Sequence, residues 1–256
     1  MPLNFDFLTV LQKSFDKYLE TSARSNEKLK ILHQKIARDL SGKLGEDYTV
    51  DSLDFGSGRE QTIPGRYLEK KVDVCVSKNG KPQAGVAVKF VMSNYAQNSN
   101  NYFENMLGET ANIRSSGTPY FQIFIIPEKL PYFDNAGTVK KIEEITPHNI
   151  DKYVALSNDN ADLFFHTPNK TLFVLLKPSV LPEEGQSKAE YKTACQGMRF
   201  GYSDAIKSFI TITRRFWKKS ITPFWRYNLT AFFDTLRRCF PSAWRWSWDR
   251  RPWERE

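Results

Sequence analysis

The sequence KVDVCVSKNGKPQAGVAVKFVM, residues 71–92, contains two apolar segments on either side of a turn. Residues 71–77 and 84–92 are rich in valine with period-two alternation, and Asn79-Gly80 lies between them, which predicts a β-hairpin. Each apolar segment carries one charge in its middle, Asp73 in the first and Lys89 in the second. A charge in a strand otherwise fit for burial is costly unless it is paired or binds an ion. The two charges therefore call for a common explanation.

The register of this hairpin decides whether the two charges can meet. A type I turn with Gly80 in a left-handed bulge gives a three-residue loop, and Asp73 then lies opposite Gly85. In that register Asp73, Ala87 and Lys89 share one face of the sheet. A two-residue Asn79-Gly80 loop would instead pair Asp73 with Val86 and place Lys89 on the opposite face. We expect the three-residue loop.

The rest of the chain predicts an α/β fold with a mixed central sheet flanked by helices. Residues 1–46 form N-terminal helices that pack on the core, and residues 47–210 form the α/β core itself. The expected helices are 3–19, 26–44, 99–115, 147–157 and 187–209. The further expected strands are 48–55, 120–126, 138–145 and 171–176, of which 120–126 is apolar enough for burial on both faces.

Composition limits the function classes. The 256 residues have a net charge of +8, but residues 211–256 hold nine Arg and two Lys against two Asp and two Glu. The basic charge thus belongs to a Trp/Arg-rich tail, which could bind nucleic acid, lie on an anionic membrane, or be a discontinuity in the sequence. We assign the tail no function. Without a bilayer-length apolar run or a disulfide framework, we expect a cytoplasmic protein with no membrane span.

Several common catalytic motifs are missing from the sequence. The phosphate-binding pattern G-x-x-x-x-G-K-[ST], the metalloprotease pattern H-E-x-x-H and the hydrolase pattern G-x-S-x-G do not occur. Gly56-Ser57-Gly58 lacks the third glycine of a dinucleotide site. Nucleotide hydrolysis, nicotinamide chemistry and zinc proteolysis are therefore disfavoured.

The remaining pattern is an aspartate on one strand and a lysine on the next, followed by a helix bearing acids and a buried strand. This layout suits phosphodiester cleavage by metal-activated water, because a carboxylate binds Mg²⁺ and a lysine supplies a compact positive charge. These residues resemble the PD-(D/E)xK nuclease superfamily. The segment from Gly85 to Pro127, with Phe90-Val91-Met92-Ser93-Asn94-Tyr95 and Glu104-Asn105-Met106-Leu107-Gly108-Glu109-Thr110, looks like that of type II restriction endonuclease-like proteins.

The resemblance implies a set of site residues around Mg²⁺. The family's metal-binding aspartate matches Asp73 and its lysine matches Lys89, but the acid expected two residues before the lysine is replaced by Ala87. Some restriction enzymes supply this acid from the following helix, where Glu104 and Glu109 are available. These two glutamates are about 140° apart around a helix, so only one can face the site. Their alternative role is that of solvated helix charges.

We favour Glu109 over Glu104, because Glu109 shares a helix face with the apolar residues of its segment. Glu60, after the Gly56–Gly58 turn, is a third candidate acid, and the backbone carbonyl of Val88 is a candidate metal ligand.

The polar segment after Lys89 is the candidate DNA contact. Asn and Gln can read adenine in the major groove, and Tyr and Arg can contact phosphates. The alternatives are a loop that caps the next helix at Ser99 or Asn100, and a structural role for the arginine at the helix end. The candidate DNA-binding residues are Asn94, Tyr95, Asn98, Asn101 and Arg114.

The sequence thus predicts a Mg²⁺-dependent DNA endonuclease of restriction type. Restriction enzymes usually act as dimers so that both strands are cut, so the resemblance also implies a homodimer. Two alternatives stay open. Asp73 and Lys89 could form an ion pair without catalytic function, or the fold could be an inactive nuclease-like module that binds DNA or a protein partner.

Overall fold

The computed structural model describes residues 2–21, 25–203, 232–234 and 236. The predicted basic tail, residues 211–256, lies outside the described residues except for Phe232, Phe233, Asp234 and Leu236. Among the helices that the described residues form, none combines the length and the apolar character that crossing a bilayer requires.

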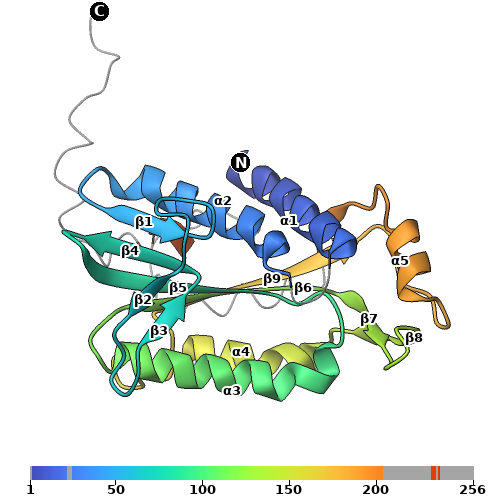
Figure 1. Cartoon of the computed structure of the whole chain (residues 1–256). Helices are drawn as coiled ribbons and strands as arrows, with labels where there is room; N and C mark the ends of the chain where they lie inside the picture. The colour runs from blue at the N-terminus through green and yellow to red at the C-terminus, as the bar shows by residue number, and fades with distance from the viewer. Residues whose placement is uncertain (1, 22–24, 204–231, 235, 237–256) are drawn as a thin grey trace, which may run out of the picture.

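The centre of the fold is a six-stranded mixed sheet (Figure 1). In spatial order the strands are β1 (Thr49–Ser52), β4 (Val74–Lys78), β5 (Lys81–Phe90), β6 (Tyr120–Pro127), β9 (Lys170–Pro178) and β10 (Phe200–Tyr202). Strand β4 is antiparallel to both β1 and β5, whereas β5, β6 and β9 run parallel and β10 is antiparallel to β9. This mixed sheet confirms the predicted α/β class.

Helices cover both faces of the sheet, as Figure 1 shows. On one face lie α1 (Pro2–Glu20) and α2 (Glu27–Leu44), and on the other lie α3 (Tyr95–Arg114) and α4 (Pro147–Asn158). The sheet between them is buried from both sides, so all eight residues of β6 are buried, as its unbroken apolar sequence predicts. The remaining elements are the pair β2 (Gln61–Ile63) and β3 (Lys70–Val72), the pair β7 (Lys129–Phe133) and β8 (Val139–Glu144), and α5 (Lys188–Ala194).

The hairpin between β4 and β5 differs from the predicted one. Lys78 pairs with Lys81, so the loop is the two residues Asn79 and Gly80, which both have positive φ angles of 51° and 71°. Such a turn matches the right-handed twist of the strands, and this explains why the chain prefers it to the predicted three-residue loop.

A bulge corrects the register that this short loop would otherwise impose. The pairing shifts between Val76 and Ser77, which leaves Gln83 as an extra residue of β5, and Cys75 then lies opposite Gly85. The predicted pairing of Asp73 with Gly85 is therefore wrong by two residues. Asp73 itself lies between β3 and β4, outside the paired residues, so the register does not assign it the face predicted for it and Lys89.

Two predicted helices have different bounds. The predicted helix 99–115 begins earlier, at Tyr95, because the Glu143 side chain of β8 accepts hydrogen bonds from the amides of Tyr95 (2.7 Å) and Ala96 (3.1 Å). The predicted caps Ser99 and Asn100 thus lie inside α3. The predicted helix 187–209 is the short α5, after which Gly197 adopts a φ of 78° and the chain enters β10 on the sheet.

Candidate active site

A cleft of about 530 Å³ opens beside the interruption between β3 and β4. It is lined from β5 by Lys89, from α3 by Glu109 and from the interruption itself by Asp73. Lys70 of β3 and Tyr120 of β6 complete its polar wall. The fold therefore brings the predicted aspartate, lysine and one helix acid to a single cavity.

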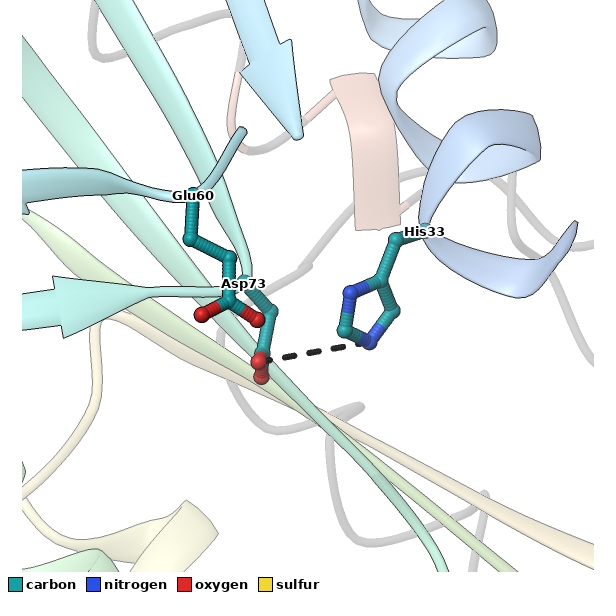
Figure 2. Close-up of side chains that lie close together, drawn as sticks. All are labelled: His33, Glu60 and Asp73. Carbon is teal, nitrogen blue, oxygen red and sulfur yellow. Dashed lines mark ion pairs between the residues drawn. The ribbon is translucent and has the colours of Figure 1, made fainter. Parts of the chain in front are cut away.

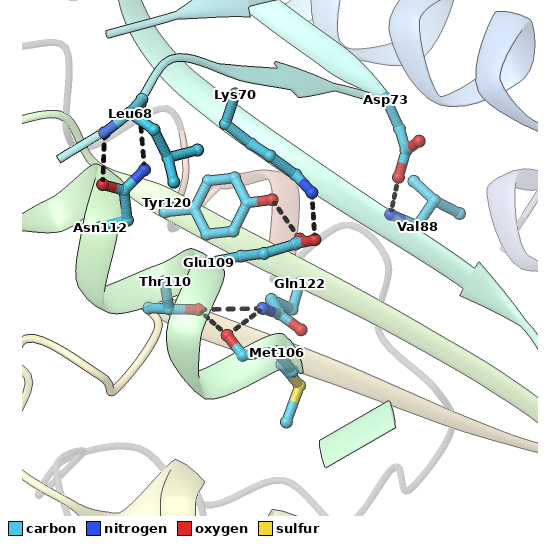
Figure 3. A network of polar contacts seen from close by, with 10 residues as sticks. All are labelled: Leu68, Lys70, Asp73, Val88, Met106, Glu109, Thr110, Asn112, Tyr120 and Gln122. Atoms are coloured by element: carbon cyan, nitrogen blue, oxygen red, sulfur yellow. Dashed lines mark hydrogen bonds and ion pairs between the residues drawn. The ribbon is translucent and has the colours of Figure 1, made fainter. Parts of the chain in front are cut away.

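Asp73 interrupts the strand that the sequence predicts over residues 71–77. β3 ends at Val72 and pairs with β2, whereas β4 begins at Val74 and pairs with β1 and β5. The Asp73 carboxylate accepts a hydrogen bond from the Val88 backbone amide at 2.6 Å (Figure 3). The N–H and C=O of one strand residue point to the same edge, so the Val88 carbonyl, a predicted ligand, also points toward the Asp73 side.

Burial opposes the ionisation of Asp73. The pKa of its carboxyl is raised to about 6, mainly by burial and also by the charge of Glu109, whereas the Val88 hydrogen bond, Lys89 and Lys70 limit the rise. Its side chain keeps 29% of its surface exposed. At neutral pH the carboxylate is thus mostly ionised and is a strong acceptor for a cation.

Glu109 is the helix acid that faces the cleft. Its carboxylate forms an ion pair with Lys70 and accepts a long hydrogen bond of 3.5 Å from the Tyr120 hydroxyl, as Figure 3 shows. Glu104 is exposed and does not line the cleft. Burial lowers the pKa of Lys152 on α4, and the charge of Glu104 partly opposes this. The preference for Glu109 on the ground of helix facing agrees with this placement.

A buried polar network fixes α3 against the sheet. Gln122 of β6 donates hydrogen bonds to the Thr110 hydroxyl (2.9 Å) and the Met106 carbonyl (3.3 Å). Thr110 in turn donates to the same carbonyl at 2.7 Å. Figure 3 shows this network beside Glu109: Thr110 is the next residue of the helix, and Met106 lies about one turn before it. It sets the position from which Glu109 reaches the cleft.

Lys89 lines the same cleft as Asp73 and lies above an aromatic ring. Its Nζ is 4.4 Å from the ring centroid of Tyr102 on α3, which is a cation–π contact. Burial lowers the pKa of Lys89, and the charges of Asp73 and Glu109 partly oppose this. Ala87 also lines the cleft. The position at which the family pattern has an acid therefore supplies no carboxylate to this site.

Asp73 also belongs to a second cluster, in which Asp73 and Glu60 are candidate metal ligands from the sequence and His33 is not. The residues His33, Glu60 and Asp73 each offer a ligand atom, and these atoms all lie within 4.8 Å of one another (Figure 2). His33 Nε2 is 4.0 Å from Asp73 Oδ1. Burial lowers the pKa of His33 to about 4, and it raises the pKa of Glu60. The only signal for His33 in the sequence is a histidine inside the apolar face of a helix, which usually means a core position.

Glu60 reaches this cluster from a tightly folded loop. Ser52 and Phe55 exchange backbone hydrogen bonds, and the Asp51 carboxylate accepts one from the Ser57 amide at 2.7 Å. At Gly56, which has a φ of 64°, a Cβ would lie 2.4 Å from the Val50 carbonyl oxygen, so only glycine fits the turn. The Gly56–Gly58 turn thus places the acid that follows it.

Most of the predicted DNA contacts have structural partners. The Asn94 side chain exchanges two hydrogen bonds with the Phe133 backbone, and Tyr95 is buried. Arg114 donates to three backbone carbonyls of residues 161–167 and so holds that loop. Asn98 is half-buried and donates to the Asn94 carbonyl, whereas Asn101 is exposed. Of this set, Asn101 has the most freely accessible side chain.

The chain was compared with models of protein families, with curated proteins and with solved structures, and none of the three comparisons gives a match.

Proposed function

We propose that this protein is a metal-dependent endonuclease that hydrolyses DNA phosphodiester bonds, of restriction type and acting as a homodimer. The observation that carries the proposal is that Asp73, Lys89 and Glu109, from three separate elements, line one cleft. The layout also matches the resemblance, since β4 and β5 are followed by α3 and by the buried strand β6, which runs parallel to β5.

The oxygen ligands available here suit a divalent cation. Asp73 is an ionised acceptor with two acids nearby, Glu60 within 4.8 Å and Glu109 across the cleft. A bound Mg²⁺ or similar ion would polarise the phosphate and lower the pKa of a bound water. Glu109 and Glu60 both lie where they can compensate for the acid that is missing at Ala87.

The other groups of the cleft act on the phosphate and its charge. Lys89 presents an ammonium group to the cleft, and its positive charge attracts the anionic phosphate. Lys70 forms an ion pair with Glu109, and the Tyr120 hydroxyl donates a hydrogen bond to the same carboxylate. These contacts hold the Glu109 side chain in place before substrate binds. Lysines 28, 70, 71 and 89 all line the cleft, and their positive charges favour a polyanionic substrate.

Plasmid cleavage tests the proposal. Supercoiled DNA is incubated with the wild type, Asp73→Asn and Lys89→Met in Mg²⁺, in Mn²⁺ and in EDTA, with Lys140→Met as a matched control because Lys140 is an exposed lysine on β8. We expect cleavage only with metal, unchanged in Lys140→Met and at least about a hundredfold slower in the two cleft variants. Cleavage that does not depend on metal, or that is equal in all four proteins, would refute the proposed metal-dependent nuclease site.

The alternative is an inactive module that binds DNA on the same fold, and the observation that favours it is Ala87. DNA binding is measured by fluorescence anisotropy in EDTA. Binding that weakens in Lys89→Met, without cleavage under any metal condition, would support the module over the enzyme.

A further inference from the structure

His33 has unsatisfied polar atoms in the core. The side chain is fully buried, and both ring nitrogens have no hydrogen-bond partner. Buried polar atoms nearly always have a partner, and an orphan costs about 1–3 kcal/mol. The nearest acid does not satisfy it, since 4.0 Å from Nε2 to Asp73 Oδ1 is beyond a hydrogen bond. The ring instead lies toward the Asp73 and Glu60 carboxylates, as Figure 2 shows.

The three side chains come from separate parts of the fold. His33 lies on α2, Glu60 follows the Gly56–Gly58 turn, and Asp73 occupies the interruption between β3 and β4. Three atoms that are all within 4.8 Å of one another lie within about 2.8 Å of a common centre (4.8 Å divided by √3). Metal ligands lie at about 2.0–2.2 Å, so shifts of roughly 0.6–0.8 Å would bring all three atoms onto one ion.

The donor chemistry distinguishes between cations. Mg²⁺ prefers oxygen ligands and keeps several waters, whereas an imidazole nitrogen favours first-row transition ions, and carboxylates also suit Mn²⁺. An ion at this position would accept the imidazole lone pair and separate the two carboxylates, which raise each other's energy when no cation lies between them. It would thus relieve the orphaned histidine and the carboxylate repulsion together.

We propose that His33, Glu60 and Asp73 form a mixed nitrogen and oxygen site for a divalent transition-metal ion, with Mn²⁺ bound in preference to Mg²⁺. The inference deepens the proposed function and rests on it for the use of the ion, because Asp73 is shared with the cleft. It also makes α2 part of the site rather than only a packing element.

Metal binding without DNA tests the site. The full chain is stripped of metal and titrated with Mn²⁺ or Mg²⁺ at pH 7.5 by calorimetry, with free Mn²⁺ followed by electron paramagnetic resonance. The variants are His33→Gln and Glu60→Gln, with Glu144→Gln as the control, because Glu144 is an exposed glutamate on β8 and does not line the cleft. Loss of an outer-shell partner weakens a metal site by about 10–100-fold, so loss of a ligand should weaken Mn²⁺ binding at least about tenfold.

We expect the wild type to bind Mn²⁺ more tightly than Mg²⁺, and His33→Gln to lose that preference. Glu60→Gln should bind Mn²⁺ weakly, whereas the affinity of Glu144→Gln should stay within about twofold of the wild type. If His33→Gln fails to fold, Mn²⁺-induced broadening of the His33 ring signals in the wild type gives the answer. Unchanged Mn²⁺ binding in Glu60→Gln, no broadening at His33, or an equal loss of binding in Glu144→Gln would each overturn the proposal. Mn²⁺ binding at the three residues without DNA cleavage would refute the proposed function alone.

Discussion

The substitution Asp73→Asn separates the charge of this residue from its hydrogen bond. An asparagine Oδ1 can still accept the Val88 amide, which the carboxylate accepts at 2.6 Å, but it carries no charge into the site. We expect the variant to be more stable than the wild type when metal is removed, and to lose the stabilisation that a divalent ion gives.

The magnitude follows from the pKa of Asp73. Burial raises it from 3.8 to about 6, so the ionised group opposes folding. Below pH 3.8 the carboxyl is protonated in both states and imposes no penalty. Between pH 3.8 and 6 the penalty grows, and above pH 6 it is constant at about 3 kcal/mol. Because 29% of the side chain is exposed, screening by water makes this figure an upper bound. In a chain of this size that is an increase in Tm of up to roughly 6–12 °C for Asp73→Asn.

Thermal unfolding in EDTA and in Mn²⁺ measures both effects. In EDTA at pH 7.5 the Tm of Asp73→Asn should exceed that of the wild type, and the difference should shrink towards zero near pH 4. Asp73→Ala should fall below Asp73→Asn, because it leaves the Val88 amide without its acceptor, at a cost of about 1–3 kcal/mol. Mn²⁺ should raise the Tm of the wild type only. A lower Tm for Asp73→Asn in EDTA would refute the reasoning, since the charged hydrogen bond would then outweigh the cost of burial.

Two further predictions concern the elements that support the site. Glu143→Gln replaces one of the two acceptor oxygens that cap α3 with an NH₂ group, so either the Tyr95 or the Ala96 amide loses its partner. The free energy of unfolding should fall by about 1–2 kcal/mol in urea titrations, whereas the exposed neighbour substitution Glu144→Gln should change it by less than about 0.5 kcal/mol. Equal effects would contradict the capping role. Asn112→Ala removes the side-chain hydrogen bonds to Tyr67 and Leu68 that hold the loop between β2 and β3. Amide hydrogen exchange at Tyr67 and Leu68 should therefore accelerate at least about tenfold. Unchanged exchange would show that the loop keeps its conformation without Asn112.

The sequence predicts the fold best where one strong pattern dominates. The unbroken apolar run of β6 and the alternating valines of the hairpin leave few alternatives, because burial fixes which residues can form them. The loop length of the hairpin was predicted wrongly, since Asn79-Gly80 favours a two-residue turn and the bulge at Gln83 has no clear sequence signature. Because the bulge offsets the shorter loop, Cys75 still lies opposite an odd-numbered residue, Gly85, whereas Asp73 lies in the interruption before β4 and reaches the cleft from there.

The candidate site could be predicted where its residues are local and not where they are distant. Asp73, Lys89 and Glu109 lie within one hairpin and the helix after it, so strand alternation and helix periodicity are enough to place them. His33 belongs to a helix packed on the other face of the sheet, and its periodicity alone predicts a core side chain. Only the tertiary structure shows that its ring lies toward the two carboxylates.

The interruption at Asp73 explains how one residue can belong to both clusters. In a continuous strand its side chain would project to one face of the sheet, while α2 and α3 lie on opposite faces. Because the strand breaks there, the carboxylate lies beside the β5 backbone, where one oxygen accepts the Val88 amide and the other lies 4.0 Å from His33. A cation bound at Asp73 would therefore lie between the N-terminal helices and the cleft, so a nuclease built on this site would need both layers of the fold in place before it could act.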